Sequence, residues 1–300
     1  MPKPNFICIG AQRCGTTRLH EVLKSHPEVS MTSCGVDVFN KELHYFDDRV
    51  LDHGLSWYES CFKSTGVAGE ITPAYAILSY KMVDLISRYL NECKILFIVR
   101  NPVERISSQL RMMRSKWAKS ASGEVNLDDL VLIFDSPAVV LRSDYLRSLQ
   151  IWSKCFGLNR VLVVNFEELL SDLGLRTVLS YLNVDKDWQP PEYISQPILP
   201  SPKDDLPVEL HWLIADRWLK MCSKFVDLGF GSAQWVEQMI EYRSRMPKSF
   251  MTKIKLIRSQ QKTTTKLRWR SLITHNRHLE KSMRKRLVEH NLICMDSLHK

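Results

Sequence analysis

The first residues with an arrangement suited to chemistry form a glycine-rich segment between an apolar run and a helical pattern. Gly10 and Gly15 are separated by four residues, and Thr16 and Thr17 follow directly. Glycines let the backbone bend so that successive N–H groups face an anion, and the N-terminus of a following helix adds partial positive charge. This arrangement is typical of a phosphate-binding loop. The alternative is an ordinary strand–turn–helix connection.

The segment departs from the P-loop of nucleotide triphosphatases at one position. Its spacing fits the pattern G-x4-G-K-[ST], but Thr16 stands where the lysine would be. Arg13 supplies a cation inside the loop instead. Because that lysine normally contacts the β- and γ-phosphates, its absence argues against hydrolysis of ATP or GTP.

A second cluster of polar residues follows the strongest predicted strand, residues 94–99. Arg100 at the end of this strand can bind a phosphate through two parallel hydrogen bonds, and Pro102 suits the first turn of a helix. Ser108 lies about two helical turns further on and adds a hydroxyl donor. Ligands of open α/β sheets bind at the carboxyl ends of the strands, which is where this cluster lies. A capped helix with a surface arginine is the alternative.

Between the two clusters, residues 41–47 read KELHYFD and contain two candidate general bases. Glu42 offers a carboxylate, and His44 offers an imidazole whose ordinary pKa suits proton transfer near neutral pH. Lys41 and a bound anion would both change the pKa of Glu42, in directions that the sequence does not settle. His44 could instead be a structural histidine bonded to the backbone.

Short apolar runs alternate with helical patterns around these residues. The runs that predict strands are residues 6–10, 66–71, 94–99 and 160–165. The patterns that predict helices are 17–26, 79–91, 102–119, 142–156, 173–183 and 208–227. This alternation predicts an α/β fold, with a P-loop-type parallel β-sheet flanked by helices on both faces.

The net charge of +9 is distributed unevenly along the chain. Residues 241–300 carry 16 Lys and Arg against 4 Asp and Glu, a net charge of +12, whereas residues 1–240 have a net charge of −3. Apolar residues recur in the basic part at a spacing that suits amphipathic helices. We therefore predict a core domain over 1–240 and a basic, helical C-terminal appendage over 241–300.

The cysteines predict a reducing environment. The eight cysteines include no CxxC pair, which argues against a zinc site and against a disulfide scaffold. Cys8 and Cys93 lie in apolar runs, where cysteine behaves as a small buried hydrophobe. No apolar run reaches the roughly 18–20 residues of a membrane-spanning helix, and no signal-peptide pattern is visible. The predicted localisation is cytoplasmic.

Three of these segments resemble motifs of the sulfotransferases that use 3'-phosphoadenosine 5'-phosphosulfate (PAPS). Residues 10–23 read GAQRCGTTRLHEVL and resemble the family's 5'-phosphosulfate loop, and residues 100–108 resemble its 3'-phosphate motif, R-x-P-x-x-R-x-x-S. The KELHYFD segment resembles that of the carbohydrate sulfotransferases related to heparan-sulfate-modifying enzymes. The resemblance spans about residues 5–240 and does not cover the basic appendage.

The resemblance implies a set of catalytic residues. Arg13 takes the role of the family's loop lysine, which bonds the oxygens between the sulfate and the leaving phosphate. Glu42 takes the role of the base, with Lys41 and His44 as further catalytic candidates. Because an arginine side chain stays charged, Arg13 would stabilise the leaving group only electrostatically.

The resemblance also implies a cofactor and its binding residues. PAPS is the sulfuryl donor, 3',5'-ADP is the product, and no metal is involved. The implied cofactor-binding residues are Gln12, Arg13, Cys14, Gly15, Thr16, Thr17, Arg18, Arg100 and Ser108. Some relatives close over the cofactor with a K-G-R loop that this chain lacks, and Lys203 is the candidate phosphate contact in its place.

One motif departs from the family pattern. Residues 69–75 read GEITPAY and resemble E-K-[ST]-P-x-Y, but Ile71 replaces the lysine that grips substrate or cofactor in several members. This change argues against heparan-type acceptor specificity while sparing the fold. Glu70 either shapes the acceptor site or is an ordinary polar residue at the end of a strand.

The sequence therefore predicts an enzyme that transfers a sulfuryl group by in-line displacement to a hydroxyl or amine of a carbohydrate, glycolipid or small-molecule acceptor. The alternatives are a nucleotide-dependent phosphotransferase and a non-catalytic module that binds 3'-phosphonucleotides. Residues 241–300 could bind an anionic polymer or an acidic membrane surface. Nucleic acid is disfavoured as a partner because no nucleic-acid-binding motif is visible.

Overall fold

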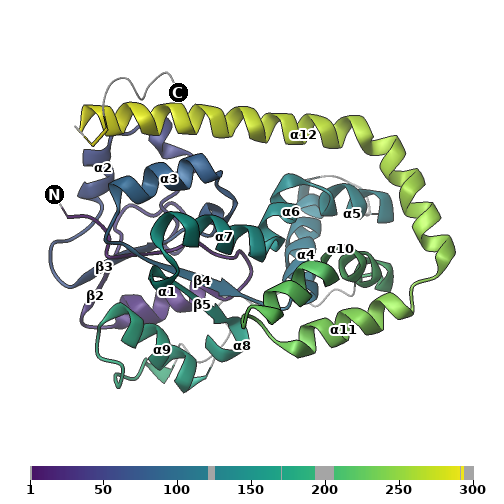
Figure 1. Cartoon of the computed structure of the whole chain (residues 1–300), viewed down its shortest axis with the longest axis horizontal. Helices are drawn as coiled ribbons and strands as arrows, with labels where there is room; N and C mark the ends of the chain where they lie inside the picture. Colours follow the sequence, from purple (N-terminus) through teal and green to yellow (C-terminus); the bar gives the residue numbers. More distant parts are fainter. Residues whose placement is uncertain (1, 121–125, 170, 193–205, 291, 294–300) are drawn as a thin grey trace. The chain divides into compact units, whose positions relative to one another are not determined.

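The structure, a computed structural model, describes residues 2–120, 126–169, 171–192, 206–290 and 292–293 (Figure 1). The chain divides into two compact units, which are described separately. The first unit comprises Met1–Val99, Arg147–Leu199 and Thr274–Lys300, and the second comprises Arg100–Leu146 and Pro200–Ile273. This division by contacts does not test the predicted boundary at residue 240, which stays a prediction.

The first unit contains a five-stranded parallel sheet with the strand order β2-β3-β1-β4-β5. Its strands are β1 (Phe6–Cys8), β2 (Val29–Met31), β3 (Val67–Ile71), β4 (Lys94–Val99) and β5 (Val161–Asn165). Strand β1 is fully buried between β3 and β4, with Cys8 in register with Ile71 and Leu96. Burial on both faces explains why β1 and β4 are continuous apolar runs in the sequence.

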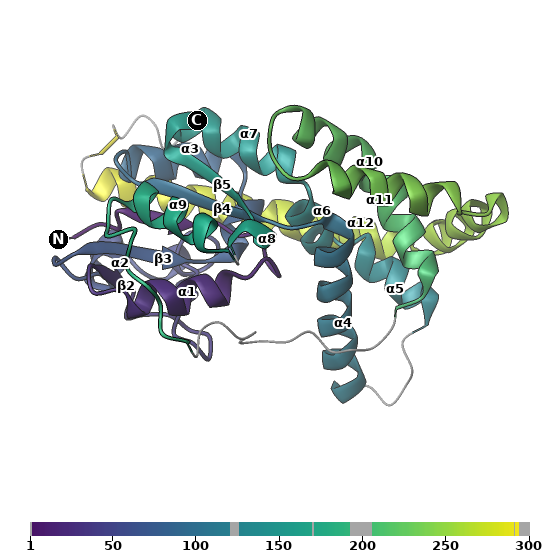
Figure 2. The same cartoon turned by 90° about the horizontal axis from the view of Figure 1, so that it is seen from below.

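Helices cover both faces of this sheet. Helices α1 (Thr16–Ser25) and α9 (Asp172–Leu182) lie on one face, and α3 (Tyr80–Tyr89) and most of α7 (Tyr145–Phe156) lie on the other (Figures 1 and 2). Helix α1 ends just before Pro27, because a proline disfavours the helical conformation in the residue that precedes it. Ser79 starts α3 by accepting a hydrogen bond from the N–H of Met82. The predicted fold class is confirmed.

Short elements complete the first unit. They are α2 (Leu55–Ser60), α8 (Phe166–Leu169) and the 3-10 helices Arg49–Leu51, Pro73–Ile77 and Leu158–Arg160. Strand β2 and helix α2 were not predicted because each is too short to show a periodic apolar pattern. The helix predicted over 142–156 is confirmed as α7 apart from its start, since the backbone at Asp144 leaves the helical conformation (φ −84°, ψ 74°).

The second unit is helical in its described residues. It contains α4 (Pro102–Ser120), α5 (Leu127–Phe134), α6 (Pro137–Ser143), α10 (Val208–Asp227) and α11 (Ala233–Ser244). Asn101 caps α4 by accepting a hydrogen bond from the N–H of Val103 at 2.9 Å. Asp135, which follows α5, pairs with both Arg217 and Arg258. This ion network joins α5 to α10 and to the basic helix that follows.

The basic appendage is helical, as predicted, and forms α12 (Lys248–Glu289), a helix of 42 residues. In the second unit its apolar side chains at Ile254 and Ile257 are buried. In the first unit its buried side chains include Leu279, Met283 and Leu287, and the ring of His275 bonds the backbone carbonyl of Asp47 at 2.9 Å. The appendage therefore contributes packing to each unit and reaches the KELHYFD segment.

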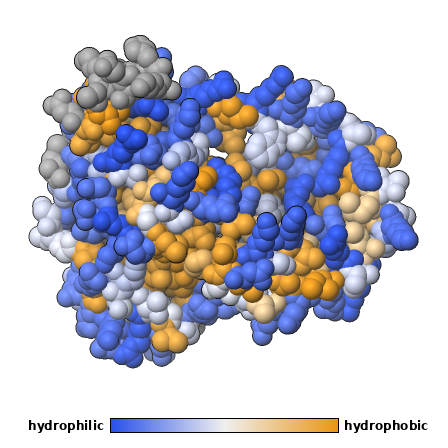
Figure 3. All heavy atoms as spheres, viewed as in Figure 1, coloured by the Kyte–Doolittle hydropathy of each residue, from blue (hydrophilic) through white to orange (hydrophobic). Residues whose placement is uncertain are grey.

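Hydrophilic and apolar residues are interspersed on the face drawn in Figure 3, as is usual for a folded protein. Among the described residues, every helix is too short or too polar to cross a membrane. The exposed apolar side chains of α12 are single residues, Leu256, Leu267 and Ile273. These isolated residues do not change the description of α12 as a basic, amphipathic helix.

Candidate functional site

The glycine-rich loop connects β1 to α1, as predicted, and its first residues are hydrogen-bonded to β4. The N–H of Ala11 donates to the Ile98 carbonyl at 2.6 Å, and the N–H of Ile98 donates to the Gly10 carbonyl at 2.7 Å. Arg13 and Gly15 both have left-handed backbone conformations, with φ of 71° and 77°. Residues that alternate between right- and left-handed conformations turn successive N–H groups toward one side, which creates an anion-binding concavity.

The residues of this loop fit a phosphate- or sulfate-bearing group. A Cβ on Gly15 would lie 2.7 Å from the ring of Phe166, so packing as well as φ requires glycine there. The Oε1 atom of Gln12 is buried and has no hydrogen-bond partner among the described residues, which leaves a polar side chain for a ligand. Helix α1 starts at Thr16, and the first N–H groups of a helix have no partner within it. The structure thus brings together the predicted residues Gln12 to Arg18.

Lys41 connects this loop to the KELHYFD segment. Its Nζ donates to Thr17 Oγ1 at 3.3 Å and lies 2.9 Å from Glu42 Oε1. Its side chain is only 3% exposed, and the Asp37 carboxylate lies 3.9 Å from the same Nζ. One buried ammonium group therefore contacts both a phosphate-loop hydroxyl and the carboxylate of the candidate base.

Glu42, His44 and Asp47 form a chain of charged side chains. The Nε2 atom of His44 lies 3.0 Å from Glu42 Oε2, and its Nδ1 atom lies 2.8 Å from Asp47 Oδ2. The hydrogen bonds to Asp47 and then to Glu42 outweigh the effect of burial and raise the pKa of His44 to about 10. At neutral pH the ring is therefore an imidazolium that donates to both carboxylates.

The carboxyl group of Glu42 is ionised at neutral pH. Burial by itself raises the pKa of Glu42, but the hydrogen bond from His44 and the charge and hydrogen bond of Lys41 outweigh it and hold that pKa at about 2. Glu42 can therefore accept a proton, whereas a protonated His44 cannot. The alternative of a backbone-bonded structural histidine does not fit, since both ring nitrogens of His44 bind carboxylates.

Asp47 is the residue of this chain that sequence reasoning did not assign. It was part of the recognised KELHYFD segment, and its spacing of three residues from His44 was the available signal. A left-handed turn at His44 (φ 53°) brings its ring back toward Asp47. Because αL conformations of non-glycine residues are uncommon, a helical or extended reading of the segment does not reveal this contact.

The charge chain predicts a pH-dependent contribution to stability. The folded-state pKa of His44 lies above its unfolded value of roughly 6.5, so the contribution is fully present below that pH and is lost as pH rises toward about 10. We expect the difference in unfolding free energy between the wild type and His44→Gln to shrink over this range in urea titrations. A difference that stays constant from neutral pH to pH 10 would contradict the arrangement.

Arg100 and Ser108 belong to the second unit, so their predicted convergence with the phosphate loop stays a prediction. The guanidinium of Arg100 donates to Glu104 Oε2 through Nε at 2.9 Å and Nη2 at 2.6 Å. A phosphate bound by Arg100 must share or displace this exposed ion pair. Ser108 is 2% exposed on α4, and the Tyr145 hydroxyl donates to the Arg100 carbonyl at 2.8 Å. Lys203 lies outside the described residues.

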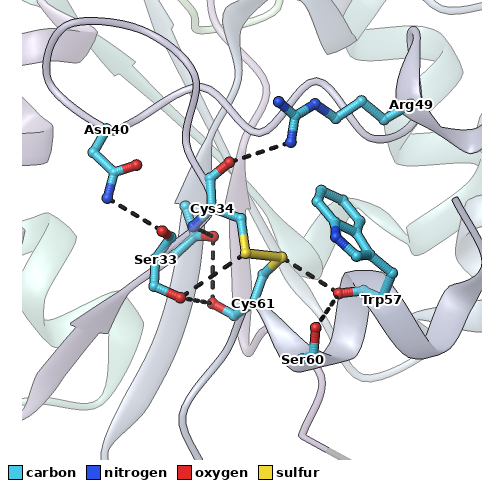
Figure 4. The surroundings of a disulfide bond; sticks show 8 residues. Ser33, Cys34, Asn40, Arg49, Trp57, Ser60 and Cys61 are labelled. Carbon is cyan, nitrogen blue, oxygen red and sulfur yellow. Dashed lines mark hydrogen bonds between the residues drawn. A yellow bond between two sulfur atoms is a disulfide. The ribbon is translucent and has the colours of Figure 1, made fainter.

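The expectation that the cysteines are all reduced is wrong, because Cys34 and Cys61 form a disulfide (Figure 4). Cys34 follows β2, and Cys61 follows α2. Around the bond, Ser33 donates its N–H to the Cys61 carbonyl at 3.1 Å, and Arg49 Nη1 donates to the Cys34 carbonyl at 3.4 Å. The pairing depends on the fold that brings the ends of β2 and α2 together, so the spacing of 27 residues gave no local signal.

The disulfide also bears on the predicted localisation. Disulfides persist mainly in oxidising compartments, so the bond removes the argument from cysteine usage for a reducing environment. Cytoplasmic localisation stays a prediction. Cys8 and Cys93 are free and buried, as their apolar surroundings predicted.

Replacing Cys34 and Cys61 by serine is expected to lower the unfolding free energy by about 3–4 kcal/mol. Without the bond, the unfolded chain regains the conformational entropy that closing a loop of this length removes. The loop closed by the bond contains the KELHYFD segment. Urea unfolding with and without a phosphine reductant measures the effect. Reductant should bring the wild type to the stability of the variant and leave the variant unchanged, whereas a wild type indifferent to reductant would contradict this role.

Comparisons with known proteins agree with the motifs. The sulfotransferase domain model matches residues 3–194. Heparan sulfate glucosamine 3-O-sulfotransferase 3B1 of Mus musculus is 30% identical over 191 residues, which cover 61% of this chain and 47% of that protein. The human protein of the same name is 30% identical over 206 residues, which cover 62% of this chain and 50% of that protein. The chain thus spans about half the length of these curated relatives.

A solved structure shares the fold of this chain. A solved sulfotransferase from Alicyclobacillus acidocaldarius superposes with a TM-score of 0.58 at 18% sequence identity. The match covers 78% of this chain and 99% of that structure. At this identity the likeness shows a shared fold and no more.

Proposed function

The chain belongs to the sulfotransferase domain family, and we propose that it transfers a sulfuryl group from PAPS to a hydroxyl or amine of an acceptor. The observation that carries the proposal is the contact of Lys41 with both Thr17 of the phosphate loop and Glu42. It joins the loop that would hold the donor to a carboxylate able to take the acceptor's proton. Sulfuryl transfer needs both at one place.

The proposed mechanism assigns one task to each group. When bound, PAPS would supply an activated sulfuryl group for in-line displacement by the acceptor oxygen or nitrogen, with the phosphate of 3',5'-ADP as the leaving group. Glu42 takes the acceptor's proton as the new bond forms. Arg13 and the N–H groups at the start of α1 stabilise the negative charge that develops on the leaving phosphate. The residues that would hold the 3'-phosphate are Arg100 and Ser108, as the sequence motif predicts.

His44 and Lys41 serve Glu42 in this proposal. Lys41 holds the Oε1 atom of Glu42, and His44 holds its Oε2 atom, so the carboxylate is fixed in orientation. These two cations also lower the basicity of Glu42. A proton taken from an acceptor would therefore be released readily from Glu42 after the transfer, while Asp47 holds the other side of the His44 ring.

We propose a carbohydrate as the acceptor, which is supported by the similarity to heparan sulfate 3-O-sulfotransferases. Ile71, which replaces the family's lysine, is fully buried in β3 and offers no contact to an anionic sugar. The acceptor is therefore proposed to differ from heparan sulfate, and glycolipids and small molecules remain candidate classes. The exposed cations of α12 are proposed to bind an anionic polymer or an acidic membrane surface.

The proposal is tested by incubating the purified chain with [35S]PAPS and a panel of desulfated glycosaminoglycans, oligosaccharides, glycolipids and small molecules that carry hydroxyl or amine groups. We expect label in one acceptor class, with release of an equal amount of 3',5'-ADP. The matched variant Glu42→Gln should bind 3',5'-ADP and form labelled product at least about 100-fold more slowly than the wild type. Labelled product made equally well by Glu42→Gln would contradict the assigned mechanism, and label in a small molecule alone would contradict the carbohydrate proposal.

A further inference from the structure

A carboxyl group that the proposed mechanism does not use is buried beneath the KELHYFD segment. Glu70 on β3 is 0% exposed. Its Oε1 atom accepts a hydrogen bond from the Tyr58 hydroxyl at 2.7 Å, and its Oε2 atom accepts one from Thr72 Oγ1 at 2.8 Å. The Tyr75 hydroxyl donates to both oxygens, at 3.1 and 3.3 Å. The alternative in which Glu70 reaches into an acceptor site does not fit this burial.

Two of these three hydroxyls also accept hydrogen bonds from the backbone of the KELHYFD segment. Thr72 Oγ1 accepts from the N–H of Leu43 at 3.0 Å, and the Tyr75 hydroxyl accepts from the N–H of Tyr45 at 3.0 Å. Because each hydroxyl donates its own hydrogen to Glu70, its lone pairs are turned toward these N–H groups. Two parallel relays therefore run from the backbone through a hydroxyl to one carboxyl group.

The relays hold the residues on both sides of His44. Leu43 precedes it and Tyr45 follows it, and His44 itself is in the left-handed conformation (φ 53°) that aims its ring at Glu42 and Asp47. A non-glycine residue persists in such a conformation only where its surroundings determine it. Burial raises the pKa of Glu70 to about 7, against the lowering effect of the three hydrogen bonds. The fold thus keeps a desolvated carboxyl group in contact with two hydroxyls that in turn bind the backbone of the KELHYFD segment.

We propose that Glu70 is a positioning residue, which acts through Thr72 and Tyr75 to hold the backbone of Leu43 and Tyr45 and thereby sets the orientation of the Glu42–His44 pair. The inference rests on the proposed function for its effect on turnover. Its structural half, the holding of two backbone N–H groups, can be measured without any activity. Misplacing a catalytic group by about 1 Å costs on the order of 100-fold in rate, so the relays are expected to affect kcat strongly.

The chain offers a matched control. Tyr58 and Tyr75 are both fully buried and both donate a hydroxyl hydrogen to Glu70, but Tyr75 alone of the two accepts from the backbone of the KELHYFD segment in the described contacts. Tyr58→Phe and Tyr75→Phe therefore remove the same atom and the same kind of bond to Glu70. Thr72→Val removes the second relay, and Thr72→Ser retains it.

The experiment combines backbone amide hydrogen exchange with steady-state kinetics on the full chain. Tyr75→Phe is expected to speed exchange at the N–H of Tyr45, and Thr72→Val at that of Leu43, each by at least about tenfold, since each N–H loses its acceptor. Both variants, and Glu70→Gln, should lower kcat by about 10- to 100-fold with little change in the KM for PAPS. Thr72→Ser should keep a kcat close to that of the wild type. Tyr58→Phe should lower kcat less than Tyr75→Phe does.

Each outcome tests a different part of the proposal. Unchanged exchange at Leu43 and Tyr45 in folded variants would overturn the positioning role whatever the activity. Faster exchange with an unchanged kcat would overturn its relevance to catalysis, as would equal losses of kcat in Tyr58→Phe and Tyr75→Phe. If the wild type transfers no sulfate to any acceptor, the proposed function fails, and faster or unchanged exchange at Leu43 and Tyr45 in Glu70→Gln still decides whether Glu70 holds the segment.

Discussion

Glu42→Gln is expected to lower kcat for sulfuryl transfer by about 100- to 10,000-fold, the range that a general base contributes. Glutamine keeps the size of the side chain, but its amide cannot take up the proton of the acceptor. The carboxylate it replaces is ionised, since the pKa of Glu42 is held at about 2 by His44 and Lys41 against the effect of burial. The variant should bind 3',5'-ADP as the wild type does, because Glu42 is not among the proposed cofactor contacts.

A control with the same chemical change separates this effect from a general loss of acidic charge. Glu21 lies on α1, outside the proposed site, and Glu21→Gln should keep the kcat of the wild type. Initial rates at saturating PAPS, with 3',5'-ADP as the measured product, compare the two variants directly. A Glu42→Gln enzyme with wild-type kcat would show that Glu42 is not the base, and another group of the KELHYFD segment would then have to take that role.

Arg13→Asn is expected to weaken binding of 3',5'-ADP by about 10- to 100-fold, the value of one charge-assisted hydrogen bond of roughly 1.5–3 kcal/mol. Arg13 lies in the phosphate loop with a left-handed backbone (φ 71°). Asparagine is the suitable replacement because it tolerates this conformation, so the charge is removed with little backbone strain. An alanine at this position would confuse lost charge with strain.

Arg13→Lys provides the matched variant, since it keeps the positive charge and loses the planar arrangement of donors. Calorimetric titration should place its affinity for 3',5'-ADP between those of the wild type and Arg13→Asn. Equal affinities in the wild type and Arg13→Asn would show that the loop binds without this cation, and the role inferred from the family's loop lysine would then be wrong.

The elements that carry the cofactor motif could be predicted from the sequence because their signals are local. Strand β4 was predicted at its observed bounds, Lys94–Val99, since it is buried on both faces and therefore continuously apolar. Helix α1 was placed within one residue because Gly15 and Pro27 mark its two ends. The glycine spacing between these elements then located the phosphate loop, which needed no information about distant contacts.

The features that were missed depend on contacts between segments far apart in the chain. Cys34 and Cys61 lie 27 residues apart, and their pairing follows from where β2 and α2 end. The role of Glu70 becomes visible only where β3 packs beneath the KELHYFD segment, since its partner hydroxyls carry no pattern of their own. The contact between His275 and the Asp47 carbonyl joins residues 228 positions apart. Sequence periodicity does not report such pairs.

Calorimetric titration of the purified full chain with 3',5'-ADP, beside ATP with magnesium and 5'-AMP, tests the central claim of PAPS-dependent transfer most directly. We expect 3',5'-ADP to bind much more tightly than 5'-AMP, because Arg100 and Ser108 are predicted to hold the 3'-phosphate that 5'-AMP lacks. ATP with magnesium should bind weakly, since Thr16 replaces the P-loop lysine. A folded chain that binds ATP with magnesium and not 3',5'-ADP would contradict the claim and favour a phosphotransferase.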